Sequence, residues 1–399
     1  MKLKIISMQN EQSGTMKKIL AITTIRSDYD LMSGLYRLLH NDPEVDLQLL
    51  VAGAHLSPTF GHTVDVIKRD GFRIFLEIES LIHADTPKSR LKSASILLQN
   101  AIDSVAAWKP DLILYAGDRE DVLVGGMLGT FLAIPTIHFF GGDHEKDGHA
   151  DTVIRHATSK LSTFHIVSIE QHRQRLLRMG EASERIFVAG SIALDKFTAH
   201  LGTAPPAPET LDKKWQNAAM VIYHPIGGEE HDAGQVMETI LLTLKKHGIP
   251  AMVSYPNSDP GNHLIIEKIR QYQNDPDFWF YTNLERAQFL QLYRHAAFLI
   301  GNSSSGIMEA ASIPMAAINV GLRQKGRYCG DNVVFCDNDA ASIERAILQV
   351  QSAPFQAALT HVRNPYGDGH SCQHAYKLIK TTDFSRLLNK TEDPLELTP

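Results

Sequence analysis

Short apolar segments alternate with longer amphipathic ones along most of this chain of 399 residues. In the first third, the apolar segments KILAIT, LQLLVAG and DLILYAGD are separated by helical patterns at residues 31–39, 64–69 and 90–107. Parallel strands must be joined by a long crossover connection, which is usually a helix. The alternation therefore predicts an α/β protein built on parallel sheets.

The alternation runs twice, with a break between the two series. The segments IPTIHFF, FHIVSI and RIFVAGS bring the first series to at least six strands, and a second series runs from AAMVIYHP to NVVFC. Between them, residues 201–213 are rich in Pro, Ala and Thr, as a linker would be. We predict two Rossmann-like, doubly wound domains, at residues 17–200 and 214–385, with a ligand-binding cleft between them.

The composition limits what these domains bind. There are 39 Lys and Arg residues against 45 Asp and Glu residues, so the net charge of -6 gives no general attraction to nucleic acid or to an anionic membrane. The 3 cysteines include no CxxC motif, which excludes a disulfide framework and a thiolate zinc site and is typical of the reducing cytoplasm. Residues 1–16 contain no signal-peptide core and are expected to be an extension, and residues 386–399 a frayed tail.

The turns that follow the predicted strands lack the common nucleotide-binding fingerprints. Neither GxGxxG nor GxxxxGK[ST] occurs in such a turn, which disfavours NAD binding and a P-loop. Two doubly wound domains without a fingerprint resemble the GT-B architecture of sugar-nucleotide glycosyltransferases.

The strongest candidate for ligand binding is the segment GNSSSGIMEA, which follows the apolar strand AAFLI. The hydroxyls of Ser303, Ser304 and Ser305, with the N–H groups of a helix beginning near Gly306, are suited to hold a phosphate. Glu309, one turn into that helix, is placed to accept hydrogen bonds from ribose hydroxyls. The alternative is a serine-rich helix cap with only a structural role.

Two further candidates follow strands of the second domain. The turn GLRQKGR carries Arg323, Lys325 and Arg327, which together would neutralise a diphosphate, although a solvated basic turn has the same composition. His224, in YHP, could donate a hydrogen bond to a diphosphate or a sugar, or be an ordinary core histidine. The second domain is therefore the expected UDP-binding half.

Three strands of the first domain are followed by polar side chains at the edge where doubly wound sheets bind ligands. Arg26 could reach a phosphate and Asp28 could orient it, unless Asp28 only caps the next helix. His55, after the second strand, is as easily structural as functional. Asp118, beside Arg119 after the strand DLILYA, is a candidate acid or base, with helix capping as the alternative.

The richest segment of the first domain follows the strand TIHFF. Its Gly-rich loop and the next helix contain 4 carboxylates and 3 histidines, a density typical of proton transfer, although a solvated loop without a role is the alternative. The histidine spacing matches neither HExxH nor a zinc finger, so a catalytic metal is not expected. The candidates from this segment are Asp143, Glu145, Asp151, Arg155 and His156.

Taken in order, the motifs TIRSDYD, GAH, GDRED, GGD…IRHATSKLS, YHP, GNSSSGIMEA and GLRQKGR resemble the hydrolysing UDP-N-acetylglucosamine 2-epimerases. This family includes bacterial sialic-acid pathway enzymes and the epimerase half of the animal bifunctional enzyme. The resemblance spans about residues 17–385. Non-hydrolysing relatives carry a GTRPE-like first loop and a different serine loop, SGG followed by QEE, and this chain has neither.

The resemblance implies a GT-B enzyme that uses no metal and no other cofactor. UDP leaves by anti-elimination as the C2 proton is removed, and water adds to a 2-acetamidoglucal-like intermediate, which gives UDP and a free manno-configured sugar. Such enzymes supply nonulosonic (sialic or legionaminic) acid biosynthesis for cell-surface polysaccharides, and homodimers or homotetramers are expected.

The resemblance also implies roles for individual residues. By position, the diphosphate should be bound by Arg26, Ser303, Ser304 and Arg323, and the ribose by Glu309. The leaving group should be contacted by His224, and proton transfer should be carried out by Asp118, Asp151 and Arg155. The expected substrate-binding set further includes Asp28, His55, Arg119, His156, Ser305, Gly306 and Arg327, and the expected catalytic set Asp143 and Glu145.

Three features depart from the family pattern. Phe140, in FFGGD, stands where relatives have an acid or a histidine, and Thr152 replaces the second of two acids. The loop DHEKDGHAD is longer and richer in His and acids, so Asp143, His144 or Glu145 could compensate. The apolar Phe140 favours a less polar sugar, such as that of UDP-N,N'-diacetylbacillosamine, over UDP-N-acetylglucosamine.

Two other functions stay open on the sequence alone. A GT-B glycosyltransferase using the same donor would have an acceptor groove and would release no free 2-epimeric sugar. A non-catalytic UDP-sugar-binding protein would fit the missing acids at Phe140 and Thr152, and would return the UDP-sugar unchanged.

Overall fold

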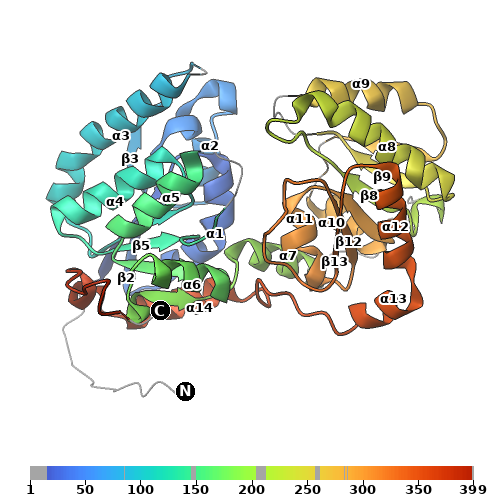
Figure 1. Cartoon of the computed structure of the whole chain (residues 1–399). Helices are drawn as coiled ribbons and strands as arrows, with labels where there is room; N and C mark the ends of the chain where they lie inside the picture. The colour runs from blue at the N-terminus through green and yellow to red at the C-terminus, as the bar shows by residue number, and fades with distance from the viewer. Residues whose placement is uncertain are drawn as a thin grey trace.

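The computed structural model describes residues 16–84, 86–144, 150–203, 213–256, 261–282, 284 and 286–397. Within these residues the chain forms two lobes, each with a parallel β-sheet covered by helices, as Figure 1 shows. The predicted α/β class with two doubly wound domains is confirmed. The candidate Glu145 and residues 204–212 of the predicted linker lie outside the described residues.

The sheet of the first lobe has 7 described strands, all parallel, in the order β3-β2-β1-β4-β5-β6-β7. The strands are β1 Lys17–Thr23, β2 Val45–Ala52, β3 Ile74–Ile78, β4 Leu112–Ala116, β5 Thr136–Phe139, β6 Phe164–Val167 and β7 Ile186–Val188. The α-helices of this part of the chain are α1 Arg26–His40, α2 Val64–Arg69, α3 Pro87–Trp108, α4 Glu120–Leu132, α5 Ala150–Leu161, α6 Glu170–Arg178 and α7 Ile192–Thr203, and the 3₁₀ helices are η1 Gly53–Leu56, η2 Pro58–Phe60 and η3 Ser183–Arg185.

The sheet of the second lobe has 6 described strands, also parallel, in the order β10-β9-β8-β11-β12-β13. The strands are β8 Ala219–Ile222, β9 Ala251–Ser254, β10 Phe278–Tyr281, β11 Phe298–Gly301, β12 Ala316–Val320 and β13 Val333–Cys336. From residue 213 onward the helices, of which the last two pack on the first lobe, are η4 Lys213–Trp215, η5 Glu230–Asp232, α8 Ala233–Lys246, α9 Asn262–Tyr272, α10 Arg286–His295, α11 Ser304–Met308, η6 Ala310–Ser312, α12 Ala340–Gln351, α13 Ala353–Leu359, α14 Ser371–Thr381 and η7 Phe384–Leu387. None of the helices in the described part of the chain combines the length and the apolar character needed to span a bilayer.

The central strands of the first sheet bury both of their faces. Along β1, Ile19 and Ala21 join a core that includes α1, whereas Leu20 and Ile22 join a core that includes α3 and α4. Successive side chains of a strand point to opposite faces, so helices on both sides are needed to cover a strand that is apolar throughout.

Two helices begin earlier than the sequence predicts. Helix α1 begins at Arg26, and α11 begins at Ser304 rather than near Gly306. In both cases the first turn consists of polar residues that cap the helix, so the apolar periodicity starts only further along the chain.

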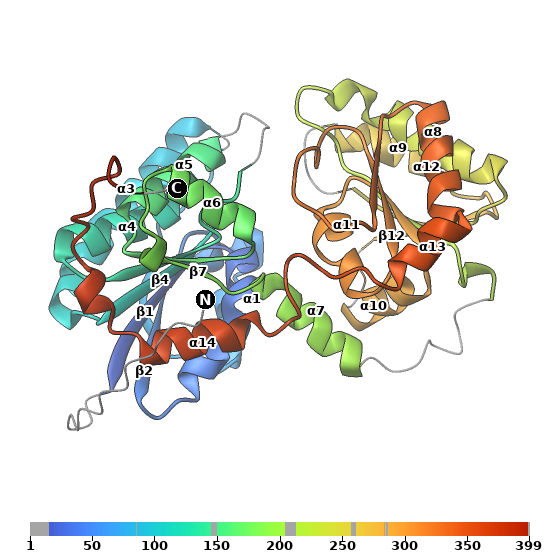
Figure 2. The same ribbon diagram turned by 60° about the horizontal axis from the view of Figure 1, so that its bottom comes forward.

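The C-terminal segment packs on the first lobe, which corrects the predicted placement of residues 371–385 in the second domain. Buried side chains of α14, such as Cys372 and Ile379, belong to the core around α1, and Figures 1 and 2 show α14 lying along the first lobe. The predicted tail is also docked there, because the buried Arg185 pairs with Glu392 at 2.7 Å. Helical periodicity shows which face of a helix is buried but not which sheet covers it.

Candidate active site

Asp118 and Arg155, two of the predicted proton-transfer residues, form an ion pair in the first lobe. Asp118 follows β4 and Gly117, whose φ of +105° allows the chain to turn there. Arg155, a buried residue of α5, donates one guanidinium N–H to Asp118 Oδ2 and another to the carbonyl of Phe140 at 3.1 Å. The arginine therefore fixes the turn after β4 against the turn after β5.

A small cavity opens beside this ion pair. Its volume is about 110 Å³, and its lining includes Thr24, Asp28, Asp118, Arg119 and Phe140. Phe140 thus lines the cavity that Asp118 also lines, packs against the core around α1, and has a positive backbone φ of 65°. A phenyl ring cannot move a proton, so Phe140 cannot serve as an acid or base at this position.

Asp143, expected as a compensating acid or base, is held instead by two cationic or hydrogen-bonding partners. Its carboxylate lies 3.2 Å from His172 Nε2 and 3.1 Å from Arg327 Nη2. Burial alone would raise the pKa of Asp143, but the hydrogen bond to His172 and the charge of Arg327 outweigh it and hold this pKa well below its usual range. An acid of that kind stays ionised at neutral pH and has no proton to donate.

The pair of Asp143 and Arg327 also joins the two lobes. Asp143 follows β5 of the first sheet, and Arg327 follows β12 of the second. Both residues follow the carboxyl ends of their strands, so these edges of the two sheets meet here. Besides contacting Asp143, Arg327, which is predicted to bind UDP, donates a hydrogen bond to Gln324 Oε1 at 3.1 Å.

Two other candidates of the same segment have partners away from Asp118. Asp151 lies 3.0 Å from Arg90 of α3, which also pairs with Glu120 at 2.6 Å. His156 stacks on His144, with 3.2 Å between His144 Nδ1 and His156 Nε2. Burial, followed by the neighbouring cationic groups, lowers the pKa of His156. The structure does not bring Asp151 or His156 to Asp118.

The turn after β1 is organised by Asp28. Its carboxylate accepts hydrogen bonds from the backbone N–H groups of Thr24 and Ile25, which begins α1, so the capping alternative is present. His55 is fully buried, and both of its ring nitrogens contact threonine hydroxyls, at 3.0 and 2.7 Å. We therefore leave His55 out of the binding residues. Arg26 is exposed, and its Nε lies 3.4 Å from the carboxylate of Asp30, one turn later in α1.

The serine turn of the second lobe combines capping with tight packing. Ser303 is the N-cap of α11, and its hydroxyl accepts a hydrogen bond from the N–H of Ser305, while Ser304 is the first residue of the helix. A Cβ at Gly306 would lie 2.9 Å from a leucine side chain of β11, so this glycine allows the helix to approach the sheet. Glu309 ends the helix as its C-cap.

Asn302, which the sequence analysis does not single out, connects three predicted elements of the second lobe. This fully buried side chain accepts a hydrogen bond from the N–H of His224 and donates one to its carbonyl, both at 2.8 Å. The carbonyl of Asn302 accepts hydrogen bonds from Arg323 and from Gln324, both at 3.2 Å. The serine turn, His224 and the basic turn are therefore held together by one amide residue.

Comparison with known proteins explains this arrangement of motifs. The family model described as UDP-N-acetylglucosamine 2-epimerase matches residues 37–380. The chain belongs to this family. The UDP-N,N'-diacetylbacillosamine 2-epimerase (hydrolyzing) of Legionella pneumophila is 34% identical over 386 residues, which cover 94% of this chain and 98% of that protein.

Solved structures agree with this 2-epimerase family fold. A UDP-GlcNAc 2-epimerase from Neisseria meningitidis, bound to UDP-GlcNAc, has a TM-score of 0.71 at 16% identity and covers 92% of this chain and 100% of its own. MurG from Acinetobacter baumannii has a TM-score of 0.54 at 12% identity and covers 92% of this chain and 100% of its own. The predicted GT-B architecture is confirmed.

Two residues at the site of this 2-epimerase family member were not predicted. Asn302 lies within the GNSSSG motif, and its position as a small polar residue at the end of a strand could have indicated its role in the site. His172 is buried in α6 and reaches Asp143 from a distant part of the sequence. Its role had no local signal, because one histidine in a basic helix has no distinctive pattern.

Proposed function

We propose that this protein is a hydrolysing UDP-sugar 2-epimerase, which releases UDP and a free sugar with inverted configuration at C2. The observation that carries this proposal is the Asp118 carboxylate, fixed by Arg155 on the wall of a cavity at the carboxyl edge of the first sheet. A positioned carboxylate is suited to take a proton from carbon. The hydrolysing type is further supported by the Legionella relative.

The proposed reaction has two steps. Asp118 removes the C2 proton as the bond between C1 and the diphosphate oxygen breaks, which forms a C1–C2 double bond and releases UDP. Water then adds to C1, and a proton adds to C2 on the opposite face. Ser303, Ser304 and Arg323 stabilise the charge of the departing diphosphate, with His224 beside it. The reaction requires no metal or other cofactor.

The wall formed by Phe140 supports a preference for UDP-N,N'-diacetylbacillosamine over UDP-N-acetylglucosamine. The first sugar has a methyl group at C6, where the second has a hydroxymethyl group. An apolar wall leaves a hydroxyl group without a hydrogen-bond partner, which is costly, whereas a methyl group needs none. Phe140 lies on the cavity wall beside Asp118, as this preference requires.

The proposed reaction also gives the protein a cellular setting. We place it in the cytoplasm, as a homodimer or homotetramer, where its free sugar product would enter nonulosonic acid biosynthesis. The absence of a CxxC motif and the odd number of cysteines are consistent with a reducing compartment.

Proton NMR in deuterated buffer tests the proposal directly. Purified protein without added metal is offered UDP-N-acetylglucosamine and UDP-N,N'-diacetylbacillosamine in separate samples. We expect free UDP and a 2-epimeric sugar carrying deuterium at C2, formed faster from the second substrate. Two unchanged sugar nucleotides that still bind would overturn the proposal and support a non-catalytic binding protein or a glycosyltransferase that lacks its acceptor.

A further inference from the structure

A second, larger cavity adjoins the one that Asp118 lines. Its volume is about 380 Å³, and it lies between the turn after β1, the end of β2, the loop after β3 and the first turns of α3 and α4. The two cavities share Ile25, Ser27 and Arg119 in their linings. The two cavities are therefore direct neighbours along these three residues.

Polar groups of the larger cavity lack partners within the protein. Among the described residues, Ser80 Oγ and Arg119 Nε have no hydrogen-bond partner, although both atoms are buried. Ser80 as a whole is only 1% exposed. Buried polar groups are normally paired, and leaving one unpaired is costly, so these groups are suited to a ligand that supplies the missing hydrogen bonds.

Asp121 adds a buried carboxyl group to the same cavity. It lies in the first turn of α4, is 8% exposed and accepts a hydrogen bond from the Thr24 side chain. Within the described part of the chain it forms no ion pair, whereas its neighbour Glu120 pairs with Arg90 at 2.6 Å. Burial raises the pKa of Asp121 to about 6, and the opposing effects of the Thr24 hydrogen bond and of the Arg119 charge do not cancel this rise.

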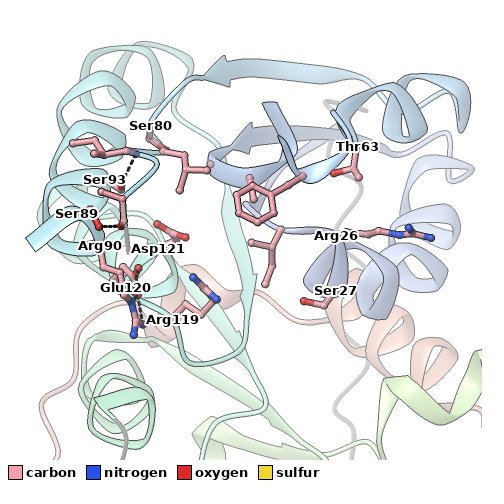
Figure 3. Close-up of a pocket in the computed structure, with 17 residues that line it drawn as sticks. Arg26, Ser27, Thr63, Ser80, Ser89, Arg90, Ser93, Arg119, Glu120 and Asp121 are labelled. Atoms are coloured by element: carbon pink, nitrogen blue, oxygen red, sulfur yellow. Dashed lines mark hydrogen bonds and ion pairs between the residues drawn. The ribbon is translucent and has the colours of Figure 1, made fainter. Parts of the chain in front are cut away.

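The remaining lining defines the chemistry of the occupant. Figure 3 shows Ser80 and Asp121 on one side of the cavity and Thr63 on the other, and the apolar residues of the lining include Ile25, Phe60 and Ile82. The charged side chains of the lining balance one another, because Arg90 pairs with Glu120 at 2.6 Å, Arg26 lies 3.4 Å from Asp30, and Arg119 opposes the charge of Asp121. The cavity is suited to an uncharged group that has an apolar part, a hydrogen-bond donor and a hydrogen-bond acceptor.

We propose that the larger cavity binds the second acylamino group of a diacylamino sugar whose C2 lies at Asp118. Asp121 accepts the amide N–H, Ser80 and Arg119 donate to the amide carbonyl, and the apolar wall covers the acyl methyl group. This inference rests on the proposed function and extends it, because it names the part of the first lobe that distinguishes a diacylamino sugar from a monoacylamino sugar.

Binding measurements with two sugar nucleotides test the cavity. Dissociation constants for UDP-N,N'-diacetylbacillosamine and UDP-N-acetylglucosamine are measured by calorimetry in an Asp118→Asn background, so that turnover does not interfere. Adding Asp121→Asn should weaken binding of the diacetylated sugar nucleotide about tenfold, because a weaker neutral acceptor replaces the carboxylate, and adding Ser80→Ala should weaken it about threefold, because one buried hydrogen bond is lost. Binding of UDP-N-acetylglucosamine should change less than twofold.

Two controls keep the result interpretable. Ser95→Ala changes an exposed serine of α3 outside the cavity and should leave both dissociation constants unchanged. Ala54→Leu fills the cavity without removing a polar group, so it tests the same idea if Asp121→Asn does not fold. This variant should weaken binding of the diacetylated compound only.

The outcomes separate this inference from the proposed function. If both sugar nucleotides lose affinity equally, or neither does, the cavity does not bind the second acylamino group and the inference fails. If the wild-type protein turns over neither compound, the proposed function fails, yet the dissociation constants still decide whether the cavity selects the diacetylated sugar.

Discussion

The carboxyl edges of the two sheets carry different kinds of side chain. At the first sheet the site consists of charged groups paired with one another, such as Asp118 with Arg155. At the second sheet it consists of hydroxyl and amide groups, such as Ser303 and Asn302, with Arg323 bound to the carbonyl of Asn302. In the proposed reaction the first lobe moves protons and the second lobe holds the leaving group.

This difference has a physical basis. Proton transfer needs a group whose charge changes, and such a group must be positioned by an opposite charge or by hydrogen bonds. A departing diphosphate already carries its charge, so fixed N–H and O–H donors stabilise it without changing protonation themselves. Variants of the first lobe should therefore change the chemistry and its pH dependence, and variants of the second should change UDP affinity.

The largest effect is expected for Asp118→Asn. Because the amide cannot accept the C2 proton, kcat should fall roughly a hundredfold to ten-thousandfold, while the dissociation constant for UDP stays the same. Steady-state kinetics with UDP release as the readout measure kcat, and calorimetry with UDP measures the dissociation constant. Asp103→Asn, on the exposed face of α3, is the matched control, and full turnover by Asp118→Asn would remove this residue from the mechanism.

A second large effect is expected for the stability of the first lobe. Glu181 is 1% exposed and contacts His165 at 3.0 Å, Lys160 at 2.7 Å and Lys390 at 2.6 Å. Burial alone would raise its pKa, but these partners lower the pKa from its ordinary value of 4.5 to about 2. A lowered pKa stabilises the folded state above about pH 4.5, and this contribution is lost as the pH falls towards 2.

Glu181→Gln should accordingly lower the free energy of unfolding by about 3 kcal/mol at pH 7. The difference from the wild type should shrink as the pH falls below 4.5, because the wild-type carboxylate then becomes protonated too. Urea unfolding at several pH values measures this difference, with the exposed neighbour changed in Glu184→Gln as the control. A difference that does not depend on pH would contradict the ionic explanation.

A smaller effect, on binding alone, is expected for Arg323→Ala in the second lobe. Loss of a charge-assisted hydrogen bond to the diphosphate should weaken UDP binding about 10- to 100-fold. Calorimetry with UDP measures the change, and Lys325→Ala removes the same charge from the same turn. Equal losses in the two variants would mean that general charge, rather than the placement of Arg323 by Asn302, determines affinity.

The smallest effect is expected for Ser303→Ala. Loss of the N-cap of α11 should cost about 1 kcal/mol of stability. Since the proposed diphosphate site includes this hydroxyl, UDP affinity should fall as well. Ser352 caps α13 in the same way, so Ser352→Ala should lower stability but leave UDP binding unchanged, as thermal unfolding and calorimetry would measure. Unchanged UDP affinity in Ser303→Ala would assign this serine a capping role only.

Most of the sheet core was predictable from the sequence, for a simple physical reason. A strand buried on both faces, such as β4 at Leu112–Ala116, is apolar at every position. The sequence analysis missed β3, which has only one buried residue among Ile74–Ile78, because an edge strand lacks that uniform apolar signal. Helix α14 was placed on the wrong lobe because its apolar face does not specify a partner.

The sequence by itself determined the α/β class and the order of the motifs, because burial periodicity and short segments at strand ends are local properties of a chain. Only the tertiary structure decided how the candidate residues are paired. Asp143 and Arg327 are 184 positions apart, and together His172 and Arg327 lower the pKa of the carboxylate that the sequence predicted as an acid or base. The structure also decided the roles of Asn302 and His55. A polar side chain can bind a ligand or support a turn, and its three-dimensional neighbours determine which of these it does.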